Sequence, residues 1–259
     1  MPVARLSSRA LVRVAGPDAR SFLHNLLTQD VETLGEGEAR FGALLSPPGR
    51  LLFDLFLWGE GDAVMLDVAA DRRADLIKRL TLYRLRAQVE ISADDRPVLA
   101  SWPNVADGFA PDPRLADLGG RRLGEGPDED ATEADYQAHR LAVGVPDPAA
   151  DGGHDRHYPI EADFDLLNGV DFHKGCFVGQ ETTSRMKRRG VIKNRMLPIA
   201  FDGPPPAPGT EVLNGELRAG EVLTGRDGAA MALLRLDRID GDLTADGRPV
   251  SVRRPDWLA

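Results

Sequence analysis

The sequence is poor in cysteine and in long apolar runs. Its 259 residues contain one cysteine, Cys176, which can form no internal disulfide and cannot by itself build a zinc or iron–sulfur site, since such sites need about four ligands. No apolar run approaches the roughly 20 residues of a membrane helix. Residues 1–16 alternate like a strand and lack the apolar core of a signal peptide. We therefore expect a soluble, cytoplasmic protein without a membrane partner.

Positive charge is also scarce. The net charge is −9 and the isoelectric point is near 5.1, which argues against a general nucleic-acid binder, because non-specific phosphate binding needs a basic surface. Hydrophobic residues make up 42% of the chain. That content is enough to bury a substantial core in two or three subdomains.

The cysteine lies in an unusual stretch, residues 171–189, with a glycine on either side and a basic cluster after it. A helix is predicted from near Val178, because the side chains that recur every four residues would share one face. Cys176 would then precede the helix, where the dipole and nearby Lys174 favour a thiolate. The alternative is that Cys176 is a small buried apolar residue, as most free cysteines are.

A second unusual residue is Asp54, in a predicted strand over residues 50–58. Both faces of this strand are apolar, so we expect it to be buried on both sides. An unpartnered carboxylate there would cost several kcal/mol. Asp54 should therefore contact a cation, a donor-rich ligand or backbone N–H groups. A structural ion pair with an arginine is the simplest alternative to a ligand site.

Other elements follow from local patterns. We expect further strands over residues 11–14, 41–45, 64–68, 88–91 and 99–102. Helices are predicted from Pro17 to near Thr28, over residues 74–80 with Asp71 as the cap, and over residues 130–143 with Thr132 and Asp135 near the start. Turns at Asn214-Gly215 and Asp246-Gly247 join short strands typical of a small antiparallel barrel.

Two charged segments have different predicted roles. Residues 94–135 carry eleven acids and four bases among many prolines and glycines, and beyond one short strand we expect a solvated loop or linker. Residues 174–195 carry seven bases and one acid, which would attract an anionic ligand tail or an acidic partner. Three residues of types that can ligate a metal occur in a glycine-flanked loop: His154, Asp155 and His157. Such a loop seldom supplies the fixed geometry that a metal site needs, so we do not expect a metal there.

The motif KGCFVGQE at residues 174–181 resembles the signature of the YgfZ family. These are folate-binding relatives of the glycine cleavage T-protein that serve iron–sulfur cluster assembly or repair. Further segments resemble the family in the same order, at residues 16–31, 49–55, 82–91, 140–146 and 159–167. The resemblance implies an α+β, T-protein-like fold. Two interlocked α/β subdomains, residues 1–93 and 94–195, would surround a folate channel with a C-terminal antiparallel β-barrel, residues 196–259.

The resemblance also implies a function, a tetrahydrofolate-binding factor for iron–sulfur cluster assembly or repair. Asp54 falls in register with the T-protein aspartate that engages folate and assists amine transfer. The residues expected to bind tetrahydrofolate, or a one-carbon-substituted form of it, are Asp54, Glu161, Arg140, Tyr83, Lys174 and Gln180. Cys176 would act at the mouth of that site, together with Asp54. The thiolate could ligate a cluster shared with a carrier or client protein, or it could form a mixed disulfide or an oxidised state.

Two other functions stay open. One is a folate-dependent aminomethyl transferase like the T-protein itself, with Asp54 as the acting carboxylate and Cys176 structural. The KGCFVGQE motif argues against it, because the T-protein branch lacks that motif. The other is a folate-binding or interaction module without chemistry, which requires Cys176 to be replaceable.

Overall fold

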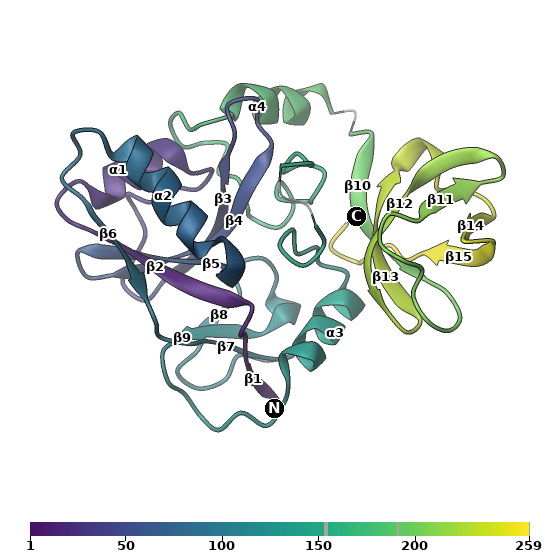
Figure 1. Cartoon of the computed structure of the whole chain (residues 1–259), viewed down its shortest axis with the longest axis horizontal. Coiled ribbons are helices and arrows are strands. Elements are labelled where there is room, and N and C mark those ends of the chain that lie inside the picture. The colour runs from purple at the N-terminus through teal and green to yellow at the C-terminus, as the bar shows by residue number, and fades with distance from the viewer. Residues whose placement is uncertain (153–154, 191, 259) are drawn as a thin grey trace.

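A computed structural model describes residues 1–152, 155–190 and 192–258, and Figure 1 shows their arrangement. The first subdomain is a five-stranded antiparallel sheet with the order β3-β4-β5-β2-β6. Its strands are β2 (Arg9–Ala15), β3 (Ala39–Leu45), β4 (Leu51–Glu60), β5 (Ala63–Ala69) and β6 (Glu90–Asp94). Two helices pack in one apolar cluster with this sheet, α1 (Ala19–Leu26) and α2 (Arg73–Arg84).

The predicted burial of β4 is confirmed, since its first nine residues, Asp54 included, are buried. The apolar side chains alternate between two cores. Phe53 and Leu55 pack with the helices, whereas Phe56 and Trp58 pack with the second subdomain. The strand therefore joins the two halves of the core, and Asp54 lies on the inner side.

The second subdomain contains a four-stranded sheet with the order β1-β7-β9-β8. Its strands are β1 (Val3–Arg5), β7 (Val98–Ser101), β8 (Ala110–Pro111) and β9 (Gly120–Leu123). The prediction of a loop or linker over residues 94–135 was therefore wrong. Composition could not show that some of these charged side chains pair with one another inside the core, as Asp112, Arg114 and Arg121 do.

Helix α3 (Glu133–Val143) follows this sheet, ends as predicted and begins three residues later than predicted. Thr132 and Asp135 form a reciprocal capping box, and Gly144 ends the helix in the left-handed conformation. The predicted cap of α2 was wrong, because Asp71 lies in a 3₁₀ turn (Ala70–Arg72) that precedes the helix. Helix α2 also continues through residues 82–84, and β6 starts at Glu90, two residues later than the predicted strand.

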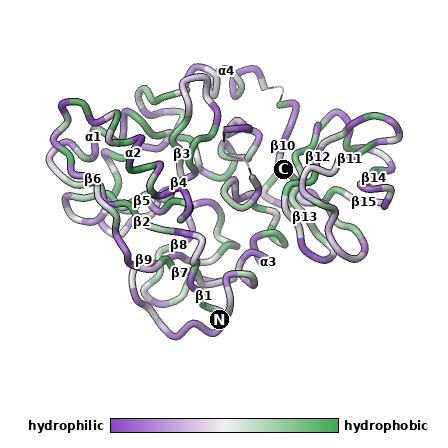
Figure 2. Tube along the Cα trace, viewed as in Figure 1, coloured by the Kyte–Doolittle hydropathy of each residue, from purple (hydrophilic) through white to green (hydrophobic). Residues whose placement is uncertain are grey.

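The C-terminal domain is a closed six-stranded antiparallel barrel, as predicted. Its strands are β10 (Asn194–Ala200), β11 (Glu211–Asn214), β12 (Leu217–Arg226), β13 (Ala229–Arg235), β14 (Leu243–Ala245) and β15 (Arg248–Val252). The second expected hairpin turns at Asp246-Gly247, as predicted. The first turns at Gly215-Glu216, one residue later than predicted, because Asn214 still pairs with Leu217. Figure 2 shows apolar residues along the inner strands and polar residues along α4 (Gln180–Arg189). No helix in the described ranges is long and apolar enough to cross a membrane.

Candidate functional site

The cysteine loop, residues 171–179, precedes α4, and Cys176 within it is exposed. Helix α4 begins at Gln180, two positions later than predicted, with Gly179 as its N-cap. Val178 packs against the core around α1 and α2, whereas the thiol remains accessible. The exposure removes the alternative of a buried packing cysteine.

A pair of glycines fixes the far end of the cysteine loop. Gly179 has φ +79°, and a Cβ atom there would lie 2.7 Å from the carbonyl oxygen of Ser46 and 2.8 Å from Cα of Gly49. Any side chain would therefore push α4 away from the turn between β3 and β4. Glycine is therefore required at position 179, because only a residue without a side chain lets the start of α4 pack this closely on the turn.

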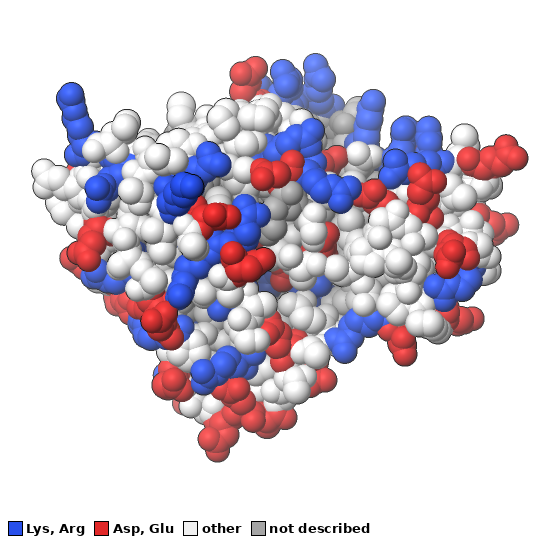
Figure 3. All heavy atoms as spheres, viewed as in Figure 1, with Lys and Arg blue, Asp and Glu red and all other residues white. Residues whose placement is uncertain are grey.

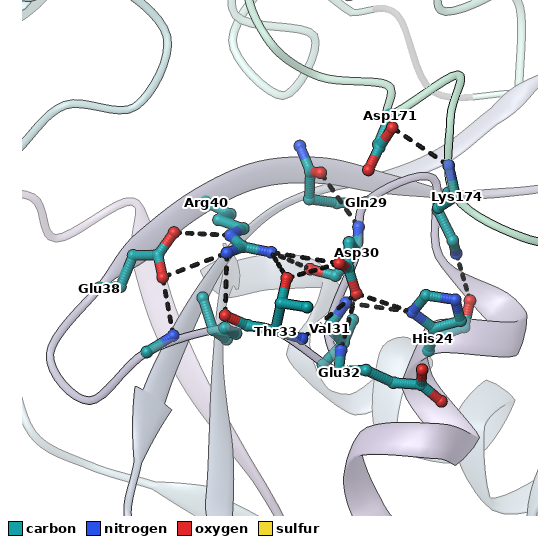
Figure 4. A network of polar contacts seen from close by, with 12 residues as sticks. His24, Gln29, Asp30, Val31, Glu32, Thr33, Glu38, Arg40, Asp171 and Lys174 are labelled. Carbon is teal, nitrogen blue, oxygen red and sulfur yellow. Dashed lines mark hydrogen bonds and ion pairs between the residues drawn. The ribbon is translucent and has the colours of Figure 1, made fainter.

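Lys174 fixes the near end of the loop (Figure 4). Its Nζ donates hydrogen bonds to the carbonyl oxygens of His24 and, at 2.7 Å, of Leu27, at the C-terminal end of α1. A cation is favourable there because the helix dipole is negative at that end. Burial lowers the pKa of Lys174 to about 8, although nearby Asp30 and Asp171 oppose the shift. Lys174 is thus predominantly a cation at neutral pH, and it holds the loop on α1.

A polar network around Asp30 supports this end of α1. Nδ1 of His24 lies 3.0 Å from Oδ1 of Asp30, and the same carboxylate accepts hydrogen bonds from the backbone N–H of Glu32 and the hydroxyl of Thr33. Burial raises the pKa of Asp30, but these hydrogen bonds outweigh it and hold the pKa below its ordinary value. Nε2 of His24 faces Gly175, 3.8 Å from the position of a Cβ atom there. The loop therefore rests on an ordered polar platform.

Helix α4, which follows the cysteine loop, presents a basic surface along its second half. Its exposed cations are Arg185, Lys187, Arg188 and Arg189, and Figure 3 shows Lys and Arg protruding over this helix. A surface cavity of about 650 Å³ lies against it, lined by Phe172, His173, Gln180, Glu181, Ser184, Lys187 and Arg188. Gln180, one of the predicted folate contacts, lies in this cavity.

Asp54 lies in a different place, inside a buried ion-pair network. Arg9 donates to Oδ2 of Asp54 at 2.8 Å and to Oδ1 of Asp67 at 2.6 Å. Arg121 donates to the other oxygen of Asp67 at 2.7 Å. Asp54 is 2% exposed. The structure therefore realises the ion-pair alternative for Asp54.

The network extends into the second subdomain through residues that sequence reasoning missed. Arg114 binds Asp112 and donates to the hydroxyl of Tyr136 at 2.9 Å. The guanidinium of Arg121 stacks 3.8 Å from the ring centre of Phe56. Three arginines thus face three aspartates between the two sheets. Balanced pairing of this kind compensates the cost of burying charge.

Glu161 lines a cavity of about 530 Å³ beside the barrel. It accepts hydrogen bonds from the backbone N–H of Tyr158 at 3.0 Å and from Nδ2 of Asn194 at 2.9 Å. Burial lowers the pKa of the neighbouring His157. Five arginines also line the cavity: Arg50, Arg156, Arg218, Arg235 and Arg238. Asp54 is not among the lining residues, so the two predicted folate carboxylates do not share this cavity.

The remaining predicted folate contacts are dispersed. Arg140 is buried and binds the carbonyl of Val145 at 2.6 Å and Asp151 at 3.2 Å. Tyr83 lies on α2, partly buried against the core. Within the described ranges no group of three or more His, Cys, Asp or Glu could hold a metal ion. Of the earlier metal candidates, His154 lies outside the described residues.

Comparison with known proteins identifies the family. The iron–sulfur cluster assembly factor IBA57, mitochondrial, of Mus musculus is 32% identical over 98% of this chain and 84% of its own length. The Homo sapiens protein of the same name has the same identity and coverage. The chain belongs to the IBA57 family. Residues 193–259 match the model of the C-terminal β-barrel domain of CAF17, the part that forms the barrel here.

The IBA57-family fold resembles that of a T-protein. The glycine cleavage system aminomethyltransferase T of Bartonella henselae matches with a TM-score of 0.80 over 99% of this chain and 86% of that chain. The sequence identity is 18%, so this match shows the fold alone. The predicted T-protein-like α+β fold with a terminal barrel is confirmed.

Proposed function

We propose that this chain acts in iron–sulfur cluster assembly, the role that the names of its IBA57 relatives state for those proteins, and that Cys176 is the residue that handles the cluster. The observation that carries the proposal is an exposed thiol on a loop fixed at both ends, by Lys174 on α1 and by Gly179 on the β3–β4 turn. A functional thiol needs this combination of access and fixed position.

In this proposal the iron–sulfur cluster is the group that is transferred between proteins, and it is not a resident cofactor of this chain. One thiolate supplies one ligand, whereas an iron–sulfur cluster needs about four, so a carrier or client protein supplies the others. The basic surface of α4 follows the cysteine loop in the chain and would attract an acidic partner. Cys176 then ligates a shared cluster while it passes between proteins.

Tetrahydrofolate binding is the second part of the proposal, and Glu161 supports it. The carboxylate lines a cavity of suitable size and could accept the two parallel donors of the pterin edge. The arginines around it would bind the anionic glutamate tail. Asp54 does not fit this role, because it is buried in the ion pair with Arg9 and does not line this cavity. Folate would supply one-carbon chemistry when bound.

An aminomethyl transferase is the second candidate, and the fold match to the T-protein favours it. The buried ion pair of Asp54 argues against it, because the acting carboxylate would have to leave Arg9. Release of methylenetetrahydrofolate from an aminomethyl donor would establish this activity. We further propose, from the eight-residue KGCFVGQE motif, a YgfZ-type bacterial member that works in the cytoplasm. Cell fractionation tests the compartment.

Complementation tests the role of Cys176. In cells lacking the protein, the activity of an iron–sulfur enzyme should recover with wild type and with the control variant Ser184→Ala, and should stay low with Cys176→Ser. Equal rescue by Cys176→Ser would contradict the proposal.

Titration calorimetry with tetrahydrofolate tests the folate site separately. Glu161→Gln should weaken binding by about tenfold or more, which corresponds to about 1.4 kcal/mol. Asp54→Asn should leave it unchanged if the variant folds. Unchanged binding by Glu161→Gln would contradict the assignment of this cavity.

A further inference from the structure

The C-terminal end of α2 has two exposed leucines that no buried role explains. Leu85 is 89% exposed and Leu82 is 65% exposed, the highest values among the large apolar side chains of the described residues. A single exposed leucine is ordinary on a protein surface. Here two of them lie three positions apart at the same end of α2.

Four cations surround these leucines. Lys78, Arg79, Arg84 and Arg86 are exposed, and within the described ranges none of their side chains has a hydrogen bond or an ion pair. The start of the same helix differs, because Arg72 pairs with Asp75 and Arg73 with Asp95. The acid nearest in sequence on the far side is the exposed Glu90. We call the four cations with Leu82 and Leu85 the α2 patch.

The backbone of Leu85 is also unusual. It has φ 44° and ψ −101° at the C-cap of α2, in a region that favours glycine and penalises a side chain. The chain thus keeps a leucine where glycine would relieve strain, and that leucine contacts little of its own protein. A strained backbone conformation whose side chain does not pack against the rest of the protein is typical of functional positions.

We infer that the α2 patch docks an acidic segment of a partner protein whose apolar side chains cover Leu82 and Leu85. The charge complementarity is local, since four unpaired cations gather on a chain of net charge −9. A membrane surface fits less well, because the apolar face of α2, with Leu76 and Leu80, is buried in the core and cannot insert. In Figure 3 the surface over α2 shows blue spheres beside white ones.

Fluorescence anisotropy with the full-length protein tests this inference. The probe is a labelled helical peptide with leucines along one face and glutamates on both flanks, and the counter-probe carries lysines in place of the glutamates. The acidic peptide should bind, more weakly as salt rises, and the basic one should not. Lys78→Glu/Arg79→Glu and Leu82→Ser/Leu85→Gly should each weaken binding by about tenfold or more.

Leu217→Ser is the matched control, because Leu217 is a 60% exposed leucine on the barrel, and it should bind like wild type. Leu85→Gly alone should raise the midpoint of urea unfolding while it weakens binding, which a merely structural leucine would not do. The inference is overturned if the acidic peptide fails to bind, if the α2 variants bind it as wild type does, or if anionic phosphatidylserine vesicles bind through the same residues in its place.

Discussion

Two charged networks in this molecule have opposite designs. The inner one, between the two sheets, pairs Arg9, Arg114 and Arg121 with three aspartates, and all six residues are buried. The outer one, around Asp30 and Lys174, is half-exposed. Its hydrogen bonds go mainly to backbone groups at the end of α1 and in the segment that follows it. The inner network joins elements distant in sequence, and the outer one orders a loop with a free thiol.

The difference separates stability from function. A buried network is costly to break, because the partner left behind keeps an uncompensated charge. A half-exposed network costs less to change, but it positions the group that meets other molecules. Asp54 is therefore expected to matter for folding, and Cys176 for activity.

The largest effect is expected for Arg121→Leu. The substitution leaves Asp67 and Asp112 with less compensation in a dry environment, so the free energy of unfolding should fall by about 3–5 kcal/mol. Urea denaturation measures it, with the exposed Arg84→Ala as the control, which should change stability by less than about 0.5 kcal/mol. A loss below about 1 kcal/mol for Arg121→Leu would show that the inner network is not a stabilising unit.

A double-mutant cycle tests the pair of Asp54 and Arg9. Asp54→Asn should lower the free energy of unfolding by about 2–3 kcal/mol, because the charge-assisted hydrogen bond from Arg9 is weakened. In the background of Arg9→Met the same change should cost less, with a coupling energy of about 1 kcal/mol or more. Additive effects would show that Arg9 and Asp54 do not stabilise the fold as a pair, and would contradict the ion-pair role of Asp54.

A smaller effect is expected for Lys174→Met, which keeps the apolar stem and removes the donor. The cysteine loop loses two hydrogen bonds to α1, so we expect a loss of about 1–2 kcal/mol. Amide hydrogen exchange should become faster over residues 171–178, and complementation should weaken although the thiol is intact. Lys78→Met, whose side chain is exposed on α2, is the control and should leave the exchange unchanged.

The smallest effect on stability is expected for Cys176→Ser. The thiol is exposed, so the free energy of unfolding should change by less than about 0.5 kcal/mol, although rescue of the iron–sulfur enzyme is lost. Parallel urea unfolding and complementation measure both quantities. A large loss of stability would make any loss of activity a folding defect and remove the contrast between the two networks.

Local signals predicted the parts of the fold that depend on neighbours in the chain. The Asp246-Gly247 turn, the capping box of Thr132 and Asp135 and the apolar run of β4 each act within a few residues, and each was confirmed. The second sheet was missed because its pairing is distant, as in the partnership of β1 with β7.

The candidate site shows the same limit. The sequence predicted that Asp54 needs a partner, but the partner is Arg9, 45 positions away, and many arginines could have served. The glycine and cysteine motif marked the loop before α4, whereas the exposure of Cys176 depends on how Lys174 and Gly179 seat that loop on α1 and on the β3–β4 turn. Those contacts join segments more than a hundred positions apart in sequence.

The pairing of β1 with β7 has a consequence for synthesis on the ribosome. Val3 lies opposite Ser101, and Asp130 also accepts a hydrogen bond from the backbone N–H of Val3. Strand β1 must therefore wait for partners roughly 100 residues later, about 5–20 seconds at ordinary translation rates. The barrel, in contrast, is made from one continuous segment and can close as soon as that segment emerges. A bulky tag fused ahead of β1 would therefore disturb the second sheet, whereas the barrel should tolerate it.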